Sequence, residues 1–306
     1  MDLFGRSPVV YVDIAPPVLT PGQTVTAVVS SGRPLGAVRA AVLQWGYTNY
    51  YRYHWGGRPD SVLAEADNAA WLFGGVGVNS SDERDADDWV GVAEEQLTIE
   101  PGRPVVGTSR FTIPVWAPPS SPELVRWSCR VVVQRGGRDI DAHGEFEVKV
   151  GPADVAAEHA AVETLAGDGA TVIEVTLNDR IVLVGSTIRG DLRLTPRVDL
   201  PDGDVAVCWR KCRLSHPAGR RAARGGAIDG PVAVVGDRIR LVRDRQVILP
   251  FHLPVPAEAA PSTSAVHSSI RWFVHVRLFY AGFPAHRTER VLLPITVVND
   301  LAHDGG

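Results

Sequence analysis

The chain has 306 residues, which is enough for two domains of about 150 residues, each with its own hydrophobic core. A hydrophobic content of 45% and a charged content of 22% are typical of a globular protein and exclude a largely disordered one. No apolar run approaches the roughly 20 residues of a membrane-spanning helix, and the first residues show no secretory signal. We therefore expect a cytoplasmic protein without a transmembrane segment.

The charge of the chain does not favour nucleic acid as a partner. The formal net charge is −4, and only Lys149 and Lys211 among the 31 basic residues are lysines. With abundant Ala, Val and Gly, this composition indicates a GC-rich, bacterial coding sequence. Three cysteines (Cys129, Cys208 and Cys212) form an odd, sparse set that suits a reducing compartment rather than a disulfide scaffold.

The first half of the chain predicts β-strands between Pro and Gly turns. In residues 23–31, Val25, Ala27 and Val29 alternate with polar residues, the period of a half-buried strand. Further strands are expected at residues 8–14, 38–55, 105–116, 124–134 and 144–150. No helical pattern alternates with these strands, so the segment predicts an all-β domain.

The strand at 38–55 ends in a cluster of aromatic residues that mostly share one parity. These are Trp45, Tyr47, Tyr51, Tyr53 and Trp55. One interpretation is a core and cross-strand ladder, and the other is a platform on which a ligand stacks.

Residues 56–100 break the strand rhythm. Residues 61–73 predict a short helix that ends at Gly74-Gly75. Seven carboxylates then lie between Asp82 and Glu95, and we expect a solvated loop there; the regular ligand spacing of an EF-hand is missing, so no metal is assigned. The acidic docking candidates in this stretch are Asp82, Glu83, Asp85, Asp87 and Asp88.

The second half restarts after an alanine-rich linker, residues 151–170, for which one or two helical turns are considered. Strands are expected from residue 171, over 204–216 and twice within 231–248, with a loop at 216–231. A strand pair over 270–280 and 289–298 turns at Ala281-Gly282.

The two halves are similar to each other in sequence. Phe111–Pro114 matches Phe251–Pro254, a proline-rich loop follows each, and Arg126-Trp127 matches Arg271-Trp272. The pattern predicts a tandem duplication: two immunoglobulin-like β-sandwiches at residues 1–150 and 171–300, with a tail at 301–306.

The repeated series resembles the arrestin superfamily over about 270 residues. The resemblance is carried by Pro21-Gly22-Gln-Thr-Val and Val184-Gly185-Ser-Thr-Ile before a strand in each half, the Phe-x-Ile/Leu-Pro segments, the proline- and serine-rich loops, and the strands after Trp127 and Trp272. It implies two sandwiches that bind protein partners as a scaffold or adaptor without chemistry of their own. As a bacterial chain, it looks most like the sporulation-control proteins of that superfamily. No Pro-Pro-x-Tyr motif and no clathrin-binding tail are present, and a phosphate-sensing polar core cannot be aligned.

Motifs for chemistry are mostly missing from the sequence. It has no G-x-S-x-G, H-E-x-x-H or Walker motif. Cys208 and Cys212 on one strand would lie about 13 Å apart at about 3.3 Å per residue. That spacing favours buried thiols over a disulfide or a zinc site. His143 and His275 lie in or beside strands and are interpreted as structural histidines, so neither a cofactor nor a metal is expected.

One basic constellation is a candidate binding site, because no acid occurs from Val205 to Ile228. Its members are Arg210, Lys211, Arg213, Arg220, Arg221 and Arg224. They could bind phosphate groups, acidic lipid or an acidic peptide, or simply keep a loop soluble. A further hypothesis is that this segment docks on the acidic stretch, within one chain or between chains.

The sequence therefore favours a non-enzymatic, arrestin-like scaffold that binds proteins through sheet faces and edges. A carbohydrate- or small-ligand-binding β-sandwich that uses the aromatic cluster is the alternative. A hydrolase is the least supported, because no constellation of catalytic residues is visible. The scaffold function is inferred from the resemblance to the arrestin superfamily, since a fold alone does not imply a function.

Overall fold

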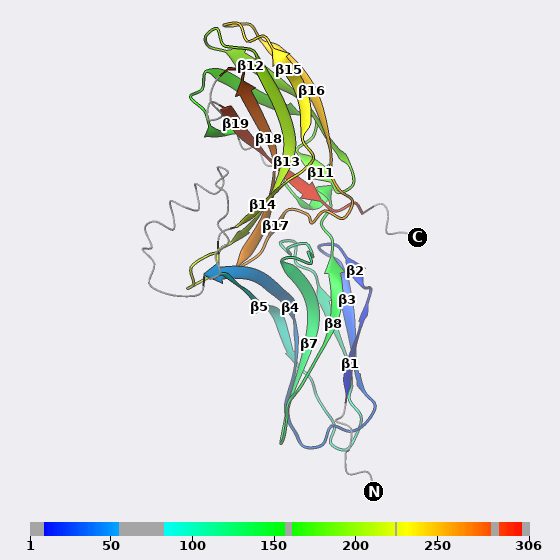
Figure 1. The fold of residues 1–306 in the computed structure, drawn as a ribbon. Coiled ribbons are helices and arrows are strands. Elements are labelled where there is room, and N and C mark those ends of the chain that lie inside the picture. Colours follow the sequence, from blue (N-terminus) through cyan, green and yellow to red (C-terminus); the bar gives the residue numbers. More distant parts are fainter. Residues whose placement is uncertain (1–8, 55–82, 157–160, 224, 283–287, 302–306) are drawn as a thin grey trace. The chain divides into compact units, whose positions relative to one another are not determined.

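The computed structural model describes residues 9–54, 83–156, 161–223, 225–282 and 288–301, and their regular secondary structure is almost entirely β-strand (Figure 1). The helical element among them is one short 3-10 helix, η1 (Pro152–Asp154). None of the described helical structure has the length and apolar character needed to cross a membrane. The chain divides into two compact units, residues 1–50 with 86–150 and residues 51–85 with 151–306.

Unit 1 contains a three-stranded and a five-stranded sheet, in the orders β1-β3-β6 and β2-β8-β7-β4-β5. Trp45 of the larger sheet stacks on Phe111 of the smaller one, with ring centroids 5.3 Å apart, so the apolar faces of the two sheets pack together. The strands are β1 (Val10–Ala15), β2 (Val18–Leu19), β3 (Thr24–Ser31), β4 (Val38–His54), β5 (Glu83–Gln96), β6 (Val106–Thr112), β7 (Val125–Arg135) and β8 (Ile140–Val148). The last residues of β4 and the first of β5 group with unit 2.

Unit 2 likewise contains a three-stranded sheet, β10-β12-β16, and a larger sheet with the path β11-β19-β18-β13-β14. Strand β15 also pairs with β13, β17 with β18 and β9 with β19. The strands are β9 (Glu163–Ala166), β10 (Thr171–Leu177), β11 (Ile181–Leu183), β12 (Thr187–Pro196), β13 (Gly203–Ser215), β14 (Gly226–Asp229), β15 (Ala233–Ile239), β16 (Val247–Pro254), β17 (Thr263–Ser264), β18 (Ser268–Tyr280) and β19 (Thr288–Val298).

The two units repeat the same strand order. In each larger sheet a short strand (β2 or β11) pairs in parallel with the last long strand (β8 or β19), and antiparallel strands follow. Before the second strand of each small sheet, Gly22 and Gly185 adopt φ +84° and +75°, which glycine adopts without steric cost. The repeated sequence motifs therefore form equivalent turns.

The proline-rich loops are also held in the same way. The indole Nε1 of Trp127 donates to the carbonyl of Pro118 at 2.9 Å, and that of Trp272 donates to the carbonyl of Ala260 at 3.1 Å. Two residues further along each loop, a serine hydroxyl accepts a backbone N–H at 2.9 Å from the last long strand of its unit. These paired contacts support the predicted duplication.

Most predicted strands are confirmed, including the alternating burial of β3 and the β18–β19 pair. Three expectations are wrong. The acidic stretch is strand β5 at a sheet edge, where an exposed face tolerates carboxylates, and the loop expected at 216–231 contains β14. The linker contains β9, which completes the edge of β19. The helix expected at 61–73 lies outside the described residues.

Candidate functional site

Strand β13 separates its side chains by parity, because successive residues point to opposite faces of a sheet. Trp209 faces the smaller sheet of unit 2, since its indole Nε1 donates to the carbonyl of Pro254 on β16 at 3.0 Å. The residues of the other parity, including Cys208 and Arg210, therefore project from the opposite face, which we call the outer face of the large sheet. Cross-strand register places His275 of β18 beside Cys208 and Asp229 of β14 beside Arg210.

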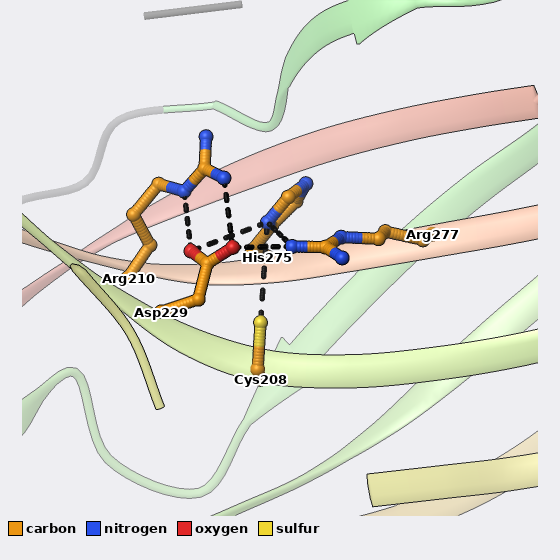
Figure 2. A network of polar contacts seen from close by, with 5 residues as sticks. All are labelled: Cys208, Arg210, Asp229, His275 and Arg277. Carbon is orange, nitrogen blue, oxygen red and sulfur yellow. Dashed lines mark hydrogen bonds and ion pairs between the residues drawn. The ribbon is translucent and has the colours of Figure 1, made fainter. Parts of the chain in front are cut away.

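These neighbours form a polar network on the outer face (Figure 2). Arg210 binds both carboxylate oxygens of Asp229, at 2.6 Å from Nε to Oδ1 and 2.9 Å from Nη2 to Oδ2. Arg277 donates to Oδ2 of the same carboxylate. The Nδ1 of His275 lies 3.8 Å from Asp229 Oδ1, 3.9 Å from Cys208 Sγ and 3.4 Å from Nη2 of Arg277.

Protonation states follow from burial and charge. Burial opposes ionisation of Asp229, but the hydrogen bonds and the positive charge of Arg210 outweigh it and hold the pKa of the carboxyl far below its usual range. Burial lowers the pKa of His275 against the opposing effect of Asp229, and burial raises the pKa of Cys208 to about 11. At neutral pH the network therefore contains an aspartate, two guanidinium groups, a neutral imidazole and a protonated thiol.

This arrangement does not form a nucleophilic relay. In a Cys-His-Asp relay the acid and the nucleophile occupy different nitrogens of the imidazole, whereas here both face Nδ1 of His275. The thiol is also buried, and its raised pKa disfavours the thiolate. These three side chains therefore lack the geometry and the charge of a catalytic triad.

A metal ion fits the same side chains poorly. One ligand atom each of Cys208, Asp229 and His275 lies within 4.8 Å of the others, a spacing compatible with a shared ion. However, Arg210 and Arg277 already bind the carboxylate, and a divalent cation would add to their positive charge. The donor set therefore suits a structural ion pair better than a metal centre.

The six basic candidates do not form one patch. Arg210 is 8% exposed, and its guanidinium is bound to Asp229. This carboxylate comes directly after the segment Val205–Ile228, whose lack of acidic residues led to the predicted basic site. Lys211, Arg213 and Arg221 are half-buried, Arg220 is exposed, and Arg224 lies outside the described residues. Alternation along β13 explains the separation, because neighbouring residues project from opposite faces.

The segment after β13 contacts the end of β4 within unit 2. The Arg221 carbonyl accepts the His54 N–H at 2.9 Å, and the guanidinium of Arg220 lies 4.7 Å from the centroid of the Tyr53 ring. Also at the end of β4, Arg52 forms ion pairs with two of the acidic candidates on β5, Glu83 at 3.3 Å and Asp85 at 3.2 Å. Asp87 and Asp88 are exposed on β5, and Asp82 lies outside the described residues.

The aromatic cluster belongs mainly to the core. Trp45, Tyr47 and Tyr51 are each 2% exposed, and the ring centroid of Tyr47 lies 4.9 Å from that of Trp127. Tyr53 is half-buried, and Trp55 lies outside the described residues. Buried rings are not available for stacking on a ligand.

A second buried carboxyl lies at the start of β19. Glu289 accepts the N–H of Ala170 at 2.9 Å and lies 3.4 Å from the hydroxyl of Tyr280. Burial and a hydrogen bond to Asp168 raise the pKa of Glu289 despite the two backbone donors of this turn. The carboxyl connects the turn after β9 to the β18–β19 hairpin, a structural role.

Comparisons with known proteins identify no family for this chain. No protein-family model matches it, and no curated protein sequence matches it.

Proposed function

We propose that the protein is a non-enzymatic, arrestin-like scaffold of the bacterial cytoplasm, built from two immunoglobulin-like β-sandwiches, that binds a protein partner by strand addition. The repeated strand order of the two units supports this architecture. The family name still rests on the sequence resemblance, and the regulatory role of the sporulation-control proteins is part of the same proposal.

The observation that carries the proposal is the edge formed by β14 and β15. In the described residues, each of these strands pairs with β13 on one side only. Three apolar side chains along this edge are strongly exposed: Ile228 at 57%, Val232 at 54% and Val234 at 67%. An open edge with exposed apolar residues offers backbone hydrogen bonds and side-chain contacts to an added strand.

The edge of the large sheet in unit 1 differs in character. Strand β5 carries Glu83, Asp85, Asp87 and Asp88, and charged residues at an edge disfavour the pairing of further strands. The contrast favours the β14–β15 edge as the docking edge. Arg220, exposed in the connection between β13 and β14, favours a partner strand with acidic residues.

The test is affinity capture from lysate of the source bacterium with wild type, V234K and the matched control V28K. Val28 is an exposed strand residue of the small sheet in unit 1, so V28K adds the same charge elsewhere. We expect a protein retained by wild type and V28K and lost by V234K, with slower amide exchange in β15 when it binds. Equal retention by V234K would contradict strand addition at this edge, and no captured protein would contradict the scaffold.

The ligand-binding alternative is less well supported. It requires exposed aromatic rings, and Trp45, Tyr47 and Tyr51 are buried in the core.

A further inference from the structure

The outer face of the large sheet in unit 2 carries more positive than negative charge. Arg277 on β18 and Arg290 on β19 are direct cross-strand partners, and such partners have Cβ atoms about 5 Å apart. Asp229 binds Arg210 and Arg277, so this carboxylate neutralises only one of three guanidinium groups. Because His275 is neutral at pH 7, the cluster has an excess of two positive charges.

Arg290 is the uncompensated member. Its Nε is buried without a hydrogen-bond partner, and its side chain forms no ion pair with another described residue. Glu163 of β9 is aligned with the next outer-face position of β19, Leu292, yet it makes no ion pair with Arg290 within the described chain. Like charges at directly opposed positions destabilise a sheet unless a counter-charge lies between them.

Two further side-chain nitrogens on the same face of the sheet are buried without partners. They are Nε of Arg277 and Nε2 of His275, the second on a side chain only 1% exposed. In the neutral ring, Nδ1 faces the Nη2 donor of Arg277, so Nδ1 accepts and the proton is on Nε2. Figure 2 shows Nε2 on the side of the ring away from Asp229. A buried N–H without an acceptor costs about 1–3 kcal/mol, so three of them on neighbouring residues of one sheet face call for a missing acceptor.

We propose that a small oxyanion, a phosphoryl group, binds on this outer face between Arg277 and Arg290, with Nε2–H of His275 as a third donor. A phosphate dianion would balance the excess charge, and its oxygens accept several N–H groups at once. An anion can reach the two guanidinium groups from the surface, because the Arg277 side chain is 26% exposed and Arg290 is only half-buried. Its contact with Nε2 of His275, which is buried, requires these side chains to shift. A metal cation would instead add to the excess positive charge of this cluster. This inference does not depend on the proposed scaffold function.

The experiment is titration calorimetry of the full chain with inorganic phosphate at pH 7.5 and low chloride, with phenyl phosphate as a separate arm for monoesters. R290Q is the test variant. R271Q is the control, because Arg271 is an exposed arginine on the same face of the same sheet. We expect R290Q to weaken binding about ten-fold or more, as for loss of one charge-assisted hydrogen bond, and R271Q to change it less than about two-fold.

Two further readouts separate this site from a general attraction of anions. Phosphate should raise the melting temperature of wild type but not of R290Q, which should itself melt higher than wild type without phosphate because the opposed charges are removed. In protein labelled with 15N-histidine, phosphate should shift the Nε2 resonance of His275. Failure of phosphate and phenyl phosphate to bind, equal binding by R290Q, or binding without the His275 shift would each overturn the proposal.

Discussion

Replacing Asp229 by Asn tests whether the outer-face network stabilises unit 2. The substitution keeps the size of the side chain but removes the charge that Arg210 contacts at 2.6 and 2.9 Å. Arg210, 8% exposed, would then retain a buried charge without a counter-ion. Breaking a buried ion pair from one side costs about 3–5 kcal/mol.

The expected loss is at the lower end of that range. The Asp229 side chain is 26% exposed, so water partly compensates for the lost carboxylate. We expect D229N to lower the free energy of unfolding by about 3 kcal/mol, or about 6–12 °C in melting temperature for a domain of about 150 residues. Urea unfolding followed by tryptophan fluorescence, with calorimetry to resolve the two units, measures this change.

A matched pair on unit 1 supplies the control. Arg130 and Asp141 form a similar two-pronged ion pair, but their side chains are 36% and 50% exposed. D141N should therefore cost less than about 1 kcal/mol. A loss for D229N no larger than that for D141N would refute the reasoning.

The pH dependence of D229N provides a sign test of the same network. The folded pKa of Asp229 lies below its unfolded value of about 3.9, so its contribution is complete above that value. The contribution disappears as pH falls through the folded pKa. The difference in stability between wild type and D229N should therefore shrink as pH falls below about 4, and a difference that grows instead would contradict the assignment.

Two further predictions concern the repeated loop contact and the buried carboxyl of β19. W127F and W272F should each lower the free energy of unfolding by about 1–3 kcal/mol, because each leaves a loop carbonyl without its indole donor; unequal effects in urea unfolding would contradict an equivalent role in the two units. The raised pKa of Glu289 means that its contribution is complete below the unfolded pKa of about 4.3 and is lost as pH rises through the folded value. E289Q, which mimics the protonated acid, should therefore gain stability relative to wild type as pH rises above about 4, and a difference that stays flat would count against the shift.

Local pattern was sufficient for most strands. Val25, Ala27 and Val29 are buried in β3 as their period of two predicts, and the β18–β19 hairpin lies within two residues of its expected bounds. The same approach missed the strand in the acidic stretch. Strands are recognised by alternating hydrophobic residues, and β5, at the end of the strand order of its sheet, carries few hydrophobic residues in alternation.

The candidate site was much less accessible to sequence reasoning. The sequence groups Arg210 with its basic neighbours because no acid occurs between Val205 and Ile228, and its partner Asp229 lies one residue past that interval. Asp229 reaches Arg210 only because β14 folds back on β13, and His275 reaches Cys208 only because β18 pairs on the other side. The spacing of hydrophobic residues along one strand does not indicate which polar residues will face each other across neighbouring strands.

The sequence by itself determined the all-β class, the repeated halves, the turn glycines and the buried parity of β3. These follow from local sterics and from the period of two, both of which are properties of neighbouring residues. The tertiary structure decided which strand became an edge, which charges were neutralised, and that Arg277 faces Arg290. Those outcomes depend on register between segments far apart in the chain, and register is set by the packing of whole sheets.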